Sequence, residues 1–208
     1  MSTPHTKERI FDAAGELMWK KSFHSVGLNE ILTTVSVPKG SFYHYFESKE
    51  HFGVEMLKHY IQAATVEKKQ MLLSIDGELD PLQRLLDMLT GSIELFQEEE
   101  GKCPCLVLKL ASEVTDLSEP MREELAKGMN VWLGILSAVF SEAVVTGRVM
   151  KGTDPDLEAR VLRDLWAGAI QRATIMKSKE PMETALAFIR RHFANLAPSQ
   201  SKRRLARN

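Results

Sequence analysis

The sequence predicts an all-α protein in two parts, a small N-terminal unit of three helices followed by a larger helical domain. Apolar residues recur at helical spacing along most of the 208 residues. Alternating β-branched stretches bounded by hairpin turn signals are absent. The content of 44% hydrophobic and 26% charged residues is typical of a globular chain long enough to bury a core. Together these observations predict helices throughout.

Capping and turn residues divide the chain into a series of helices. Thr3 and Pro4 are suited to begin the first one, and Ser48 is suited to cap a long one. The segment 74–81, which ends in an Asp-Pro pair, is the first clear break after the N-terminal part. The expected helices cover about 4–20, 28–35, 38–45, 48–73, 82–98, 104–114, 120–145, 156–176 and 181–196.

Composition limits the function classes that fit. No apolar run approaches the ~18 residues of a membrane span, and the N-terminus has no apolar signal region, so we expect a cytoplasmic protein without membrane contact. Cys103 and Cys105 are separated by one residue, which is poor geometry for a disulfide and indicates reduced thiols. No metal-spaced cluster, phosphate-binding glycine loop or paired nucleophile and histidine is present, so we expect neither an enzyme nor a cofactor.

The two short helices have the dimensions of a helix-turn-helix, with Ser36 and Val37 between them. Bulk charge does not favour nucleic acid, because the net charge is −1 and residues 1–57 hold six Lys/Arg against seven Asp/Glu. A DNA interface must therefore depend on a few well-placed donors.

The second short helix carries small, aromatic and donor residues where a core helix has leucine and alanine. A glycine and a serine in its first turn permit close approach to base edges in the major groove. A tyrosine, a histidine and a lysine offer donors to phosphate oxygens, and a second lysine begins the next helix, where exposed N–H groups favour an anion. The candidate DNA-binding residues are Lys39, Gly40, Ser41, Tyr43, His44 and Lys49.

The neighbouring aromatic residues are expected to pack inward. Phe42, Tyr45 and Phe46 fit this role, because four aromatic residues within five positions cannot all share one face of a helix. An alternative interpretation makes all four aromatics core and His44 an ordinary surface residue. Lys39 and Glu47 are equally compatible with plain solvated surface.

The segment around these candidates resembles the TetR family of one-component repressors, whose helix-turn-helix ends in Gly-x-x-Tyr-x-His/Tyr-Phe-x-x-Lys-Glu. The matching string is Gly40-Ser41-Phe42-Tyr43-His44-Tyr45-Phe46-Glu47-Ser48-Lys49-Glu50, and the resemblance covers about residues 7–57. Two positions depart from the pattern. Val26-Gly27 stand where a serine or threonine usually caps the second helix, and Ser36 stands where the turn often has glycine.

The resemblance implies a domain plan and partners. Residues 1–50 would bind double-stranded DNA at a palindromic operator, and residues 51–196 would bind a small-molecule effector and dimerise. Independently of the resemblance, the short, polar and basic tail 197–208 is expected to be disordered. The homodimer would form through about 156–196, where both helices have wide apolar faces. These faces carry Val161, Leu162, Leu165, Trp166, Ala169, Ile170, Ala185, Leu186, Phe188, Ile189, Phe193 and Leu196, with Gly168 and Ala173 allowing close approach.

The segment 103–122 resembles the NemR-like subgroup of this family, which responds to reactive electrophiles. The resemblance makes Cys105 the sensing thiol. Independently, a thiol in the first turn of a helix lies at the positive end of the macrodipole, and Lys102 and Lys109 are placed to favour its thiolate.

Two other interpretations of this half stay open. Cys105 also fits the role of a small, buried apolar residue. A non-covalent effector would instead use a pocket lined by Trp132 and Trp166, with Phe96 and Phe140, although such residues are more often core. For the whole chain, the alternative is a helical protein-interaction or ligand-binding module without specific DNA binding.

Overall fold

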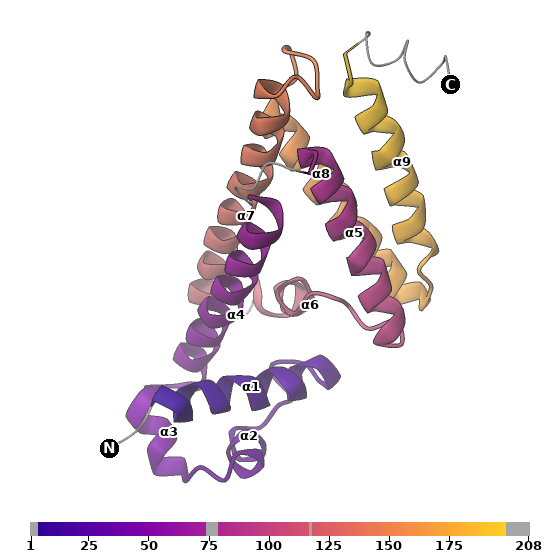
Figure 1. Ribbon diagram of the computed structural model, residues 1–208. Helices are drawn as coiled ribbons and strands as arrows, with labels where there is room; N and C mark the ends of the chain where they lie inside the picture. The colour runs from indigo at the N-terminus through magenta and orange to yellow at the C-terminus, as the bar shows by residue number, and fades with distance from the viewer. Residues whose placement is uncertain (1–3, 74–78, 117, 199–208) are drawn as a thin grey trace. The chain divides into compact units, whose positions relative to one another are not determined.

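The computed structural model describes residues 4–73, 79–116 and 118–198, and within these ranges it holds helices and no strand. The predicted all-α class is confirmed. In chain order the helices are α1 (Pro4–Lys20), α2 (Leu28–Thr34), α3 (Lys39–Tyr45), α4 (Lys49–Leu72), α5 (Pro81–Glu98), α6 (Leu106–Val114), α7 (Glu119–Val145), α8 (Pro155–Met176) and α9 (Glu180–Leu196) (Figure 1).

Helix boundaries follow the predicted ones closely, with one difference that bears on function. Helix α6 begins at Leu106 and not at Pro104, because Cys105 has extended backbone angles (φ −139°, ψ 108°) and is the N-cap. Helix α3 similarly begins one residue after its proline, which is its N-cap. The predicted cap Thr3 and the tail residues 199–208 lie outside the described residues.

The chain divides into two compact units. The first contains Met1–Ala64 and Cys105–Met129, and the second contains Thr65–Pro104 and Asn130–Asn208. The first unit is therefore larger than a DNA-reading domain of residues 1–50, because it includes α6 and the beginning of α7. Figure 1 shows α1, α2 and α3 grouped at the beginning of α4.

Helices α1 and α4 approach each other closely in the first unit. The Tyr60 hydroxyl donates to the Phe11 carbonyl over 3.0 Å. A Cβ at Gly15 would lie 1.9 Å from this hydroxyl oxygen, so only glycine fits there without a shift. Burial, with the charges of Asp12 and Glu16, raises the pKa of Tyr60 to about 12, so the phenol stays a donor at neutral pH.

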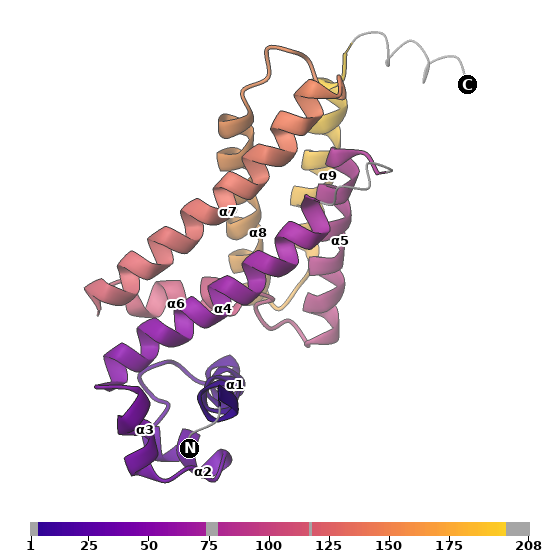
Figure 2. The same ribbon diagram turned by 60° about the vertical axis from the view of Figure 1, so that its left-hand side comes forward.

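The second unit is built around α5, α8, α9 and most of α7. Figure 2 shows α5, α8 and α9 running beside one another. Arg84 is only 6% exposed and pairs with the Glu142 carboxylate, which compensates for burying its charge. Asp80 and Asp154 cap α5 and α8 by accepting backbone N–H bonds, as expected for the residues that precede Pro81 and Pro155.

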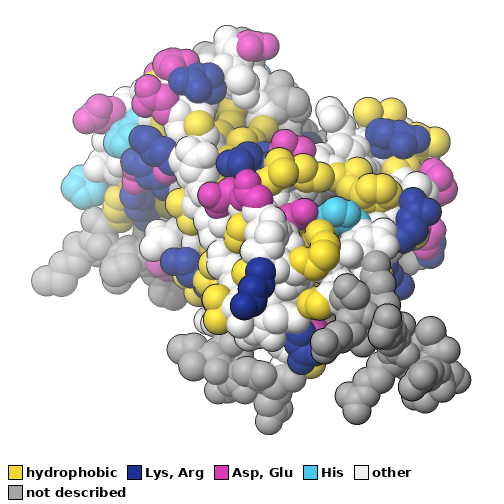
Figure 3. Space-filling model, turned by 90° about the horizontal axis from the view of Figure 1, so that it is seen from above, with side chains coloured by type: hydrophobic (Ala, Val, Ile, Leu, Met, Phe, Trp, Pro, Cys, Tyr) yellow, Lys and Arg dark blue, Asp and Glu magenta, His cyan; other side chains and the backbone are white. Residues whose placement is uncertain are grey.

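Helix α7 corrects one prediction from the sequence. By length and composition it is apolar enough to cross a membrane, with a mean hydropathy of 1.5 over 18 residues, so the statement that no such run exists was wrong. Its residues 128–145 hold a single charge, Glu142, which is paired inside the second unit. One side of α7 contributes core residues such as Val139 and Phe140. Charges of both signs lie among the hydrophobic side chains on the face in Figure 3.

Glu55 provides a pH test of the α1–α4 packing. Hydrogen bonds from Lys58 and Lys7, both 2.9 Å long, lower the pKa of Glu55 from 4.5 to about 2. Because the folded-state pKa is depressed, the stabilisation is complete above pH 4.5 and is lost as the pH falls towards 2.

We therefore expect Glu55→Gln to lower the free energy of unfolding at pH 7 by about 1–3 kcal/mol. The difference from wild type should shrink between pH 5 and pH 3 in urea denaturation. Glu67→Gln, which removes an exposed carboxylate on the same helix, is the control and should have little effect at any pH. A difference for Glu55→Gln that does not vary with pH would contradict the role of its charge.

Candidate nucleic-acid interface and sensor helix

An aromatic cluster fixes the orientation of α3. Phe42 and Phe46 are 0% and 1% exposed, and their ring centroids lie 4.9 Å apart. They pack on Phe52 of α4, at 5.5 and 5.1 Å, and Phe46 also packs on Phe11 of α1, at 5.6 Å. The predicted inward position of both phenylalanines is confirmed. Tyr45 is half-buried, and its hydroxyl is buried without a hydrogen-bond partner among the described atoms.

The opposite face of α3 points to solvent. Lys39, Gly40 and His44 are exposed, Tyr43 retains 53% of its surface, and Ser41 is half-buried. A Cβ on Gly40 would meet nothing within 4 Å. The packing of this protein therefore does not require glycine there, and the open space is available to a partner that approaches the backbone closely.

The turn before α3 carries the strain expected from the sequence. Ser36 has φ +54°, a left-handed conformation that non-glycine residues adopt at some cost. The Val37 amide donates to the Leu32 carbonyl over 3.0 Å, and Arg9 of α1 donates to the Val35 carbonyl over 2.6 Å. These bonds fix the angle between α2 and α3.

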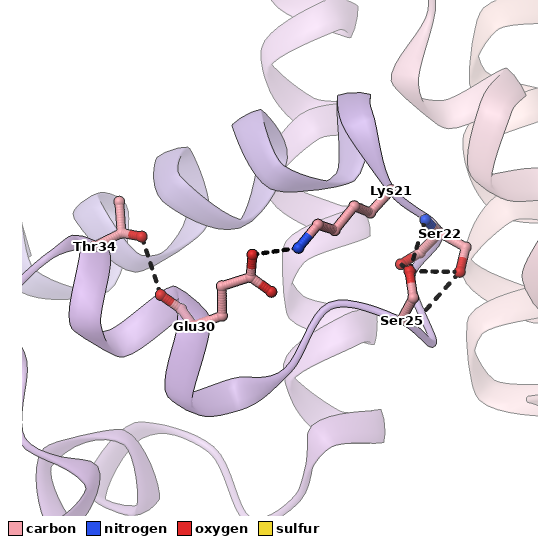
Figure 4. Close-up of polar contacts among 5 residues, drawn as sticks. All are labelled: Lys21, Ser22, Ser25, Glu30 and Thr34. Carbon is pink, nitrogen blue, oxygen red and sulfur yellow. Dashed lines mark hydrogen bonds and ion pairs between the residues drawn. The ribbon is translucent and has the colours of Figure 1, made fainter.

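Short polar contacts fasten the loop between α1 and α2. Lys21 pairs with Glu30 of α2 at 2.5 Å, and the hydroxyls of Ser22 and Ser25 lie 2.9 Å apart (Figure 4). Thr34 donates to the Glu30 carbonyl over 3.0 Å. The N-cap of α2 is Gly27, which makes no side-chain capping bond, so this cap supplies no hydroxyl, as the sequence indicates.

Lys49 is bound to the loop between α1 and α2. Its ammonium donates to the carbonyls of Val26 and His24 over 2.9 and 3.2 Å and lies 5.2 Å from the Phe23 ring centroid. Burial lowers the pKa of Lys49 from its usual value. These contacts tie the first turn of α4 to the α1–α2 loop. A phosphate contact by Lys49 stays a prediction.

Several acidic groups near α3 are engaged in polar contacts. The carboxylates of Glu30 and Glu55 are paired with lysines, and Glu50 accepts a hydrogen bond from Ser118 over 2.7 Å. Within the described part of the chain, no ion pair involves Lys39. Lys39 thus keeps its charge available on the outward face of α3, and the exposed carboxylate of Glu47 follows directly after the helix.

Cys105 is the N-cap of helix α6, which begins at Leu106. The Cys105 Sγ accepts the Leu108 N–H over 3.4 Å and so serves as the side-chain cap of the helix. Cys105 is half-buried, whereas Cys103 is 9% exposed. The sensing candidate therefore combines partial solvent access with a bond that depends on the sulfur atom.

Lys109 and Glu113 connect α6 to the end of α1. The Lys109 ammonium donates to the carbonyls of Met18, Trp19 and Lys21, the last two over 2.9 and 3.2 Å. Glu113 accepts the Phe23 N–H over 2.8 Å. The expected interaction of Lys109 with the Cys105 thiolate stays a prediction, and Lys102 pairs with Glu99 instead. Glu113 was missed, although its four-residue spacing from Lys109 places both on one face of a helix.

Trp132 and Trp166 belong to the second unit, and both are half-buried. The Trp132 indole donates to Thr65 over 3.0 Å, and the Lys68 ammonium lies 4.7 Å from its ring centroid. Phe96 and Phe140, the other pocket candidates, are buried at 2% and 0% exposure. Phe96 and Phe140 are therefore core residues, whereas the two tryptophans remain candidates for effector contact.

The apolar faces of α8 and α9 are divided between the core of the protomer and solvent. Several residues expected at a dimer interface are buried within the chain, namely Leu162, Ala169, Ile170, Ala173, Ala185, Leu186, Ile189, Phe193 and Leu196. Val161 and Phe188 remain 49% and 48% exposed, and Leu157 remains 51% exposed. Gly168 is exposed, and a Cβ there would meet nothing within 4 Å.

Comparisons with known proteins agree with this arrangement in both halves of the chain. Residues 10–56 match the family model "Bacterial regulatory proteins, tetR family", and residues 81–189 match "Tetracyclin repressor-like, C-terminal domain". The HTH-type transcriptional repressor NemR of Escherichia coli K12 is 38% identical over 92% of this chain and 96% of its own length. The transcriptional regulator AcuR of Cereibacter sphaeroides is 32% identical over 89% and 84%.

Solved structures give the same relationship. The crystal structure of the reduced form of E. coli NemR has a TM-score of 0.83 at 37% identity, covering 89% of this chain and 95% of that one. A regulatory protein TetR from Rhodobacter sphaeroides has a TM-score of 0.79 at 32% identity, covering 89% and 97%.

Proposed function

This chain belongs to the TetR family of bacterial regulatory proteins and is a DNA-binding transcriptional repressor and not an enzyme; from that premise we propose that it binds a palindromic operator as a homodimer. We propose further that a reactive electrophile releases it by modifying Cys105. A repressor of this kind acts beside the chromosome, so we assign it to the cytoplasm.

One observation supports the DNA contact above all others. The exposed face of α3 holds Lys39, Gly40, Tyr43 and His44 over a buried aromatic cluster, so a short helix is held rigidly with its small and donor residues outward. A rigid helix with a narrow first turn enters a major groove at little entropic cost, and ring-borne donors bind phosphates without losing many rotamers.

Variants of α3 test this contact separately from folding. We expect Gly40→Leu to melt like wild type, because its Cβ has open space, and to bind operator about 10- to 100-fold more weakly, because it blocks base-edge contacts. Lys39→Gln should reduce the slope of log affinity against log salt by about 0.9 for one lost phosphate contact.

The measurement is fluorescence anisotropy with a palindrome from upstream of the gene, at several salt concentrations. Lys20→Gln, which removes an exposed lysine of α1, is the control. Absence of any operator preference in the wild-type protein would favour the alternative, a protein-interaction module.

The proposal for release depends on the place of Cys105 at the beginning of α6. An activated alkene would add to the thiolate: a carbon–sulfur bond forms, the carbon–carbon π bond breaks, and the neighbouring carbon takes a proton from water. An aldehyde would add through its carbonyl carbon: a carbon–sulfur bond forms, the carbon–oxygen π bond breaks, and the oxygen takes a proton from water. Partial exposure of Cys105 gives such a reagent access, and its sulfur already makes the capping bond to Leu108. A crystal structure of E. coli NemR, which is 37% identical, is of its reduced form, which agrees with a redox-sensitive group in that relative.

A paired cysteine experiment tests the release mechanism. Treatment with N-ethylmaleimide or methylglyoxal should weaken operator binding by wild type and by Cys103→Ser about 5- to 150-fold. Cys105→Ser should keep its affinity. The adduct is located by peptide mass spectrometry, with anisotropy as the binding measurement. Equal release of Cys105→Ser by these reagents would exclude the thiol mechanism.

The dimer is assigned to the exposed stripe of α8 and α9, which contains Leu157, Val161, Gly168 and Phe188. These positions remain apolar or small after the protomer has formed its own core, and Gly168 permits close approach of a second helix. A two-fold dimer would present two recognition helices about one DNA turn apart, roughly 34–36 Å or a multiple of it.

Substitution at Gly168 distinguishes the interface from the core. Because its Cβ points to open space, Gly168→Leu should fold but shift the protein from dimer to monomer by sedimentation velocity. Gly134→Leu, at an exposed open glycine on α7, is the matched control and should remain dimeric. A dimeric Gly168→Leu together with a monomeric Gly134→Leu would place the interface on α7 instead.

A further inference from the structure

We infer that the contact between α6 and the end of α1, made by Lys109 and Glu113, carries the signal from Cys105 to the helix-turn-helix. The inference rests on the proposed release through Cys105 and adds the residues that transmit it. All of these residues lie within the first compact unit. Lys109 and Glu113 touch neither the proposed effector atom nor the outward face of α3, so they are positioning residues.

The backbone at the end of α1 is bonded to side chains of α6. A helix leaves its last carbonyls without partners inside the helix, and a cation placed there stabilises them and the negative end of the helix dipole. The Lys109 ammonium donates to the carbonyls of Met18, Trp19 and Lys21. Beyond the helix end, the Phe23 N–H is bonded to Glu113. The conformation of this segment therefore depends on two side chains of α6.

The first turn of α6 connects Cys105 to Lys109. The Cys105 Sγ accepts the Leu108 N–H, and the Cys105 carbonyl accepts the Lys109 N–H over 3.0 Å. Lys109 is thus bonded to the carbonyl of the sensing residue through its main chain and to α1 through its side chain. Leu106 and Val107, both 5% exposed, hold the turn against the core, so it cannot rearrange without moving its neighbours.

A change at Cys105 would therefore affect the end of α1. An adduct on a half-buried capping sulfur needs additional space and weakens the bond to Leu108, which displaces the first turn and with it Lys109. The α1 carbonyls then lose their cation, and α1 loosens at its end. Since Phe11 of α1 packs on Phe46 behind α3, this change reaches the recognition helix without any contact between effector and DNA-binding residues.

The experiment compares Lys109→Met, Lys109→Arg and the control Lys102→Met before and after N-ethylmaleimide. Lys102 is three residues from Cys105, against four for Lys109, but it pairs with Glu99. We expect Lys109→Met to bind operator as weakly before modification as modified wild type does, and alkylation to reduce its affinity by less than about 3-fold further. Wild type, Lys109→Arg and Lys102→Met should each lose about 5- to 150-fold on alkylation.

The lack of a further loss is the decisive readout. If Lys109 only stabilised the fold, its free-energy cost would add to that of the adduct, and alkylation of Lys109→Met would still produce the full loss. That result would overturn the inference. Mass spectrometry must show equal labelling of Cys105 in all variants. If wild type itself keeps its operator affinity after labelling, the proposed release fails first, and this inference fails with it.

If Lys109→Met does not fold, the inference can be tested by hydrogen exchange on the wild-type protein. Alkylation should speed exchange in the peptide that contains the Phe23 amide, because its acceptor is Glu113. Unchanged exchange there, with operator release intact, would show that the signal takes another path.

Discussion

Burial of Phe42 and Phe46 against Phe11 and Phe52 is the constraint on which the remaining structure of the DNA-reading unit depends. A helix of seven residues is not stable by itself in water, so α3 forms because its inner face joins this cluster. The same burial determines the orientation of its outer face. The same packing that forms the core therefore also exposes the candidate DNA-binding residues.

Helix α6 supplies polar groups to the end of α1. Its beginning is capped by a cysteine sulfur, and its Lys109 and Glu113 side chains satisfy backbone groups at and beyond the end of α1. Helix α6 thus completes hydrogen bonds that the end of α1 leaves open. A chemical change at one end of such a pair alters the bonding of both, which is the physical basis of the coupling inferred above.

The apolar faces of α8 and α9 serve two purposes. The side that contains Leu162 and Ile189 is buried within the protomer, whereas Val161 and Phe188 stay about half exposed. Because one helix face is wider than the protomer core requires, an apolar stripe is left outside it. The exposed glycine at 168 makes this stripe suitable for another helix at short distance.

The sequence by itself determined the helical class, the approximate helix boundaries and the outward set at Lys39, Gly40 and Tyr43, because periodicity, caps and residue size are local properties. Only the tertiary structure decided what Lys49 and Lys109 bind. A flexible ammonium takes whichever carbonyls the fold brings near it, and these lie 23 to 91 residues away in sequence. Glu113 entered the candidate site for the same reason, since its partner belongs to a loop that spacing along α6 cannot reveal.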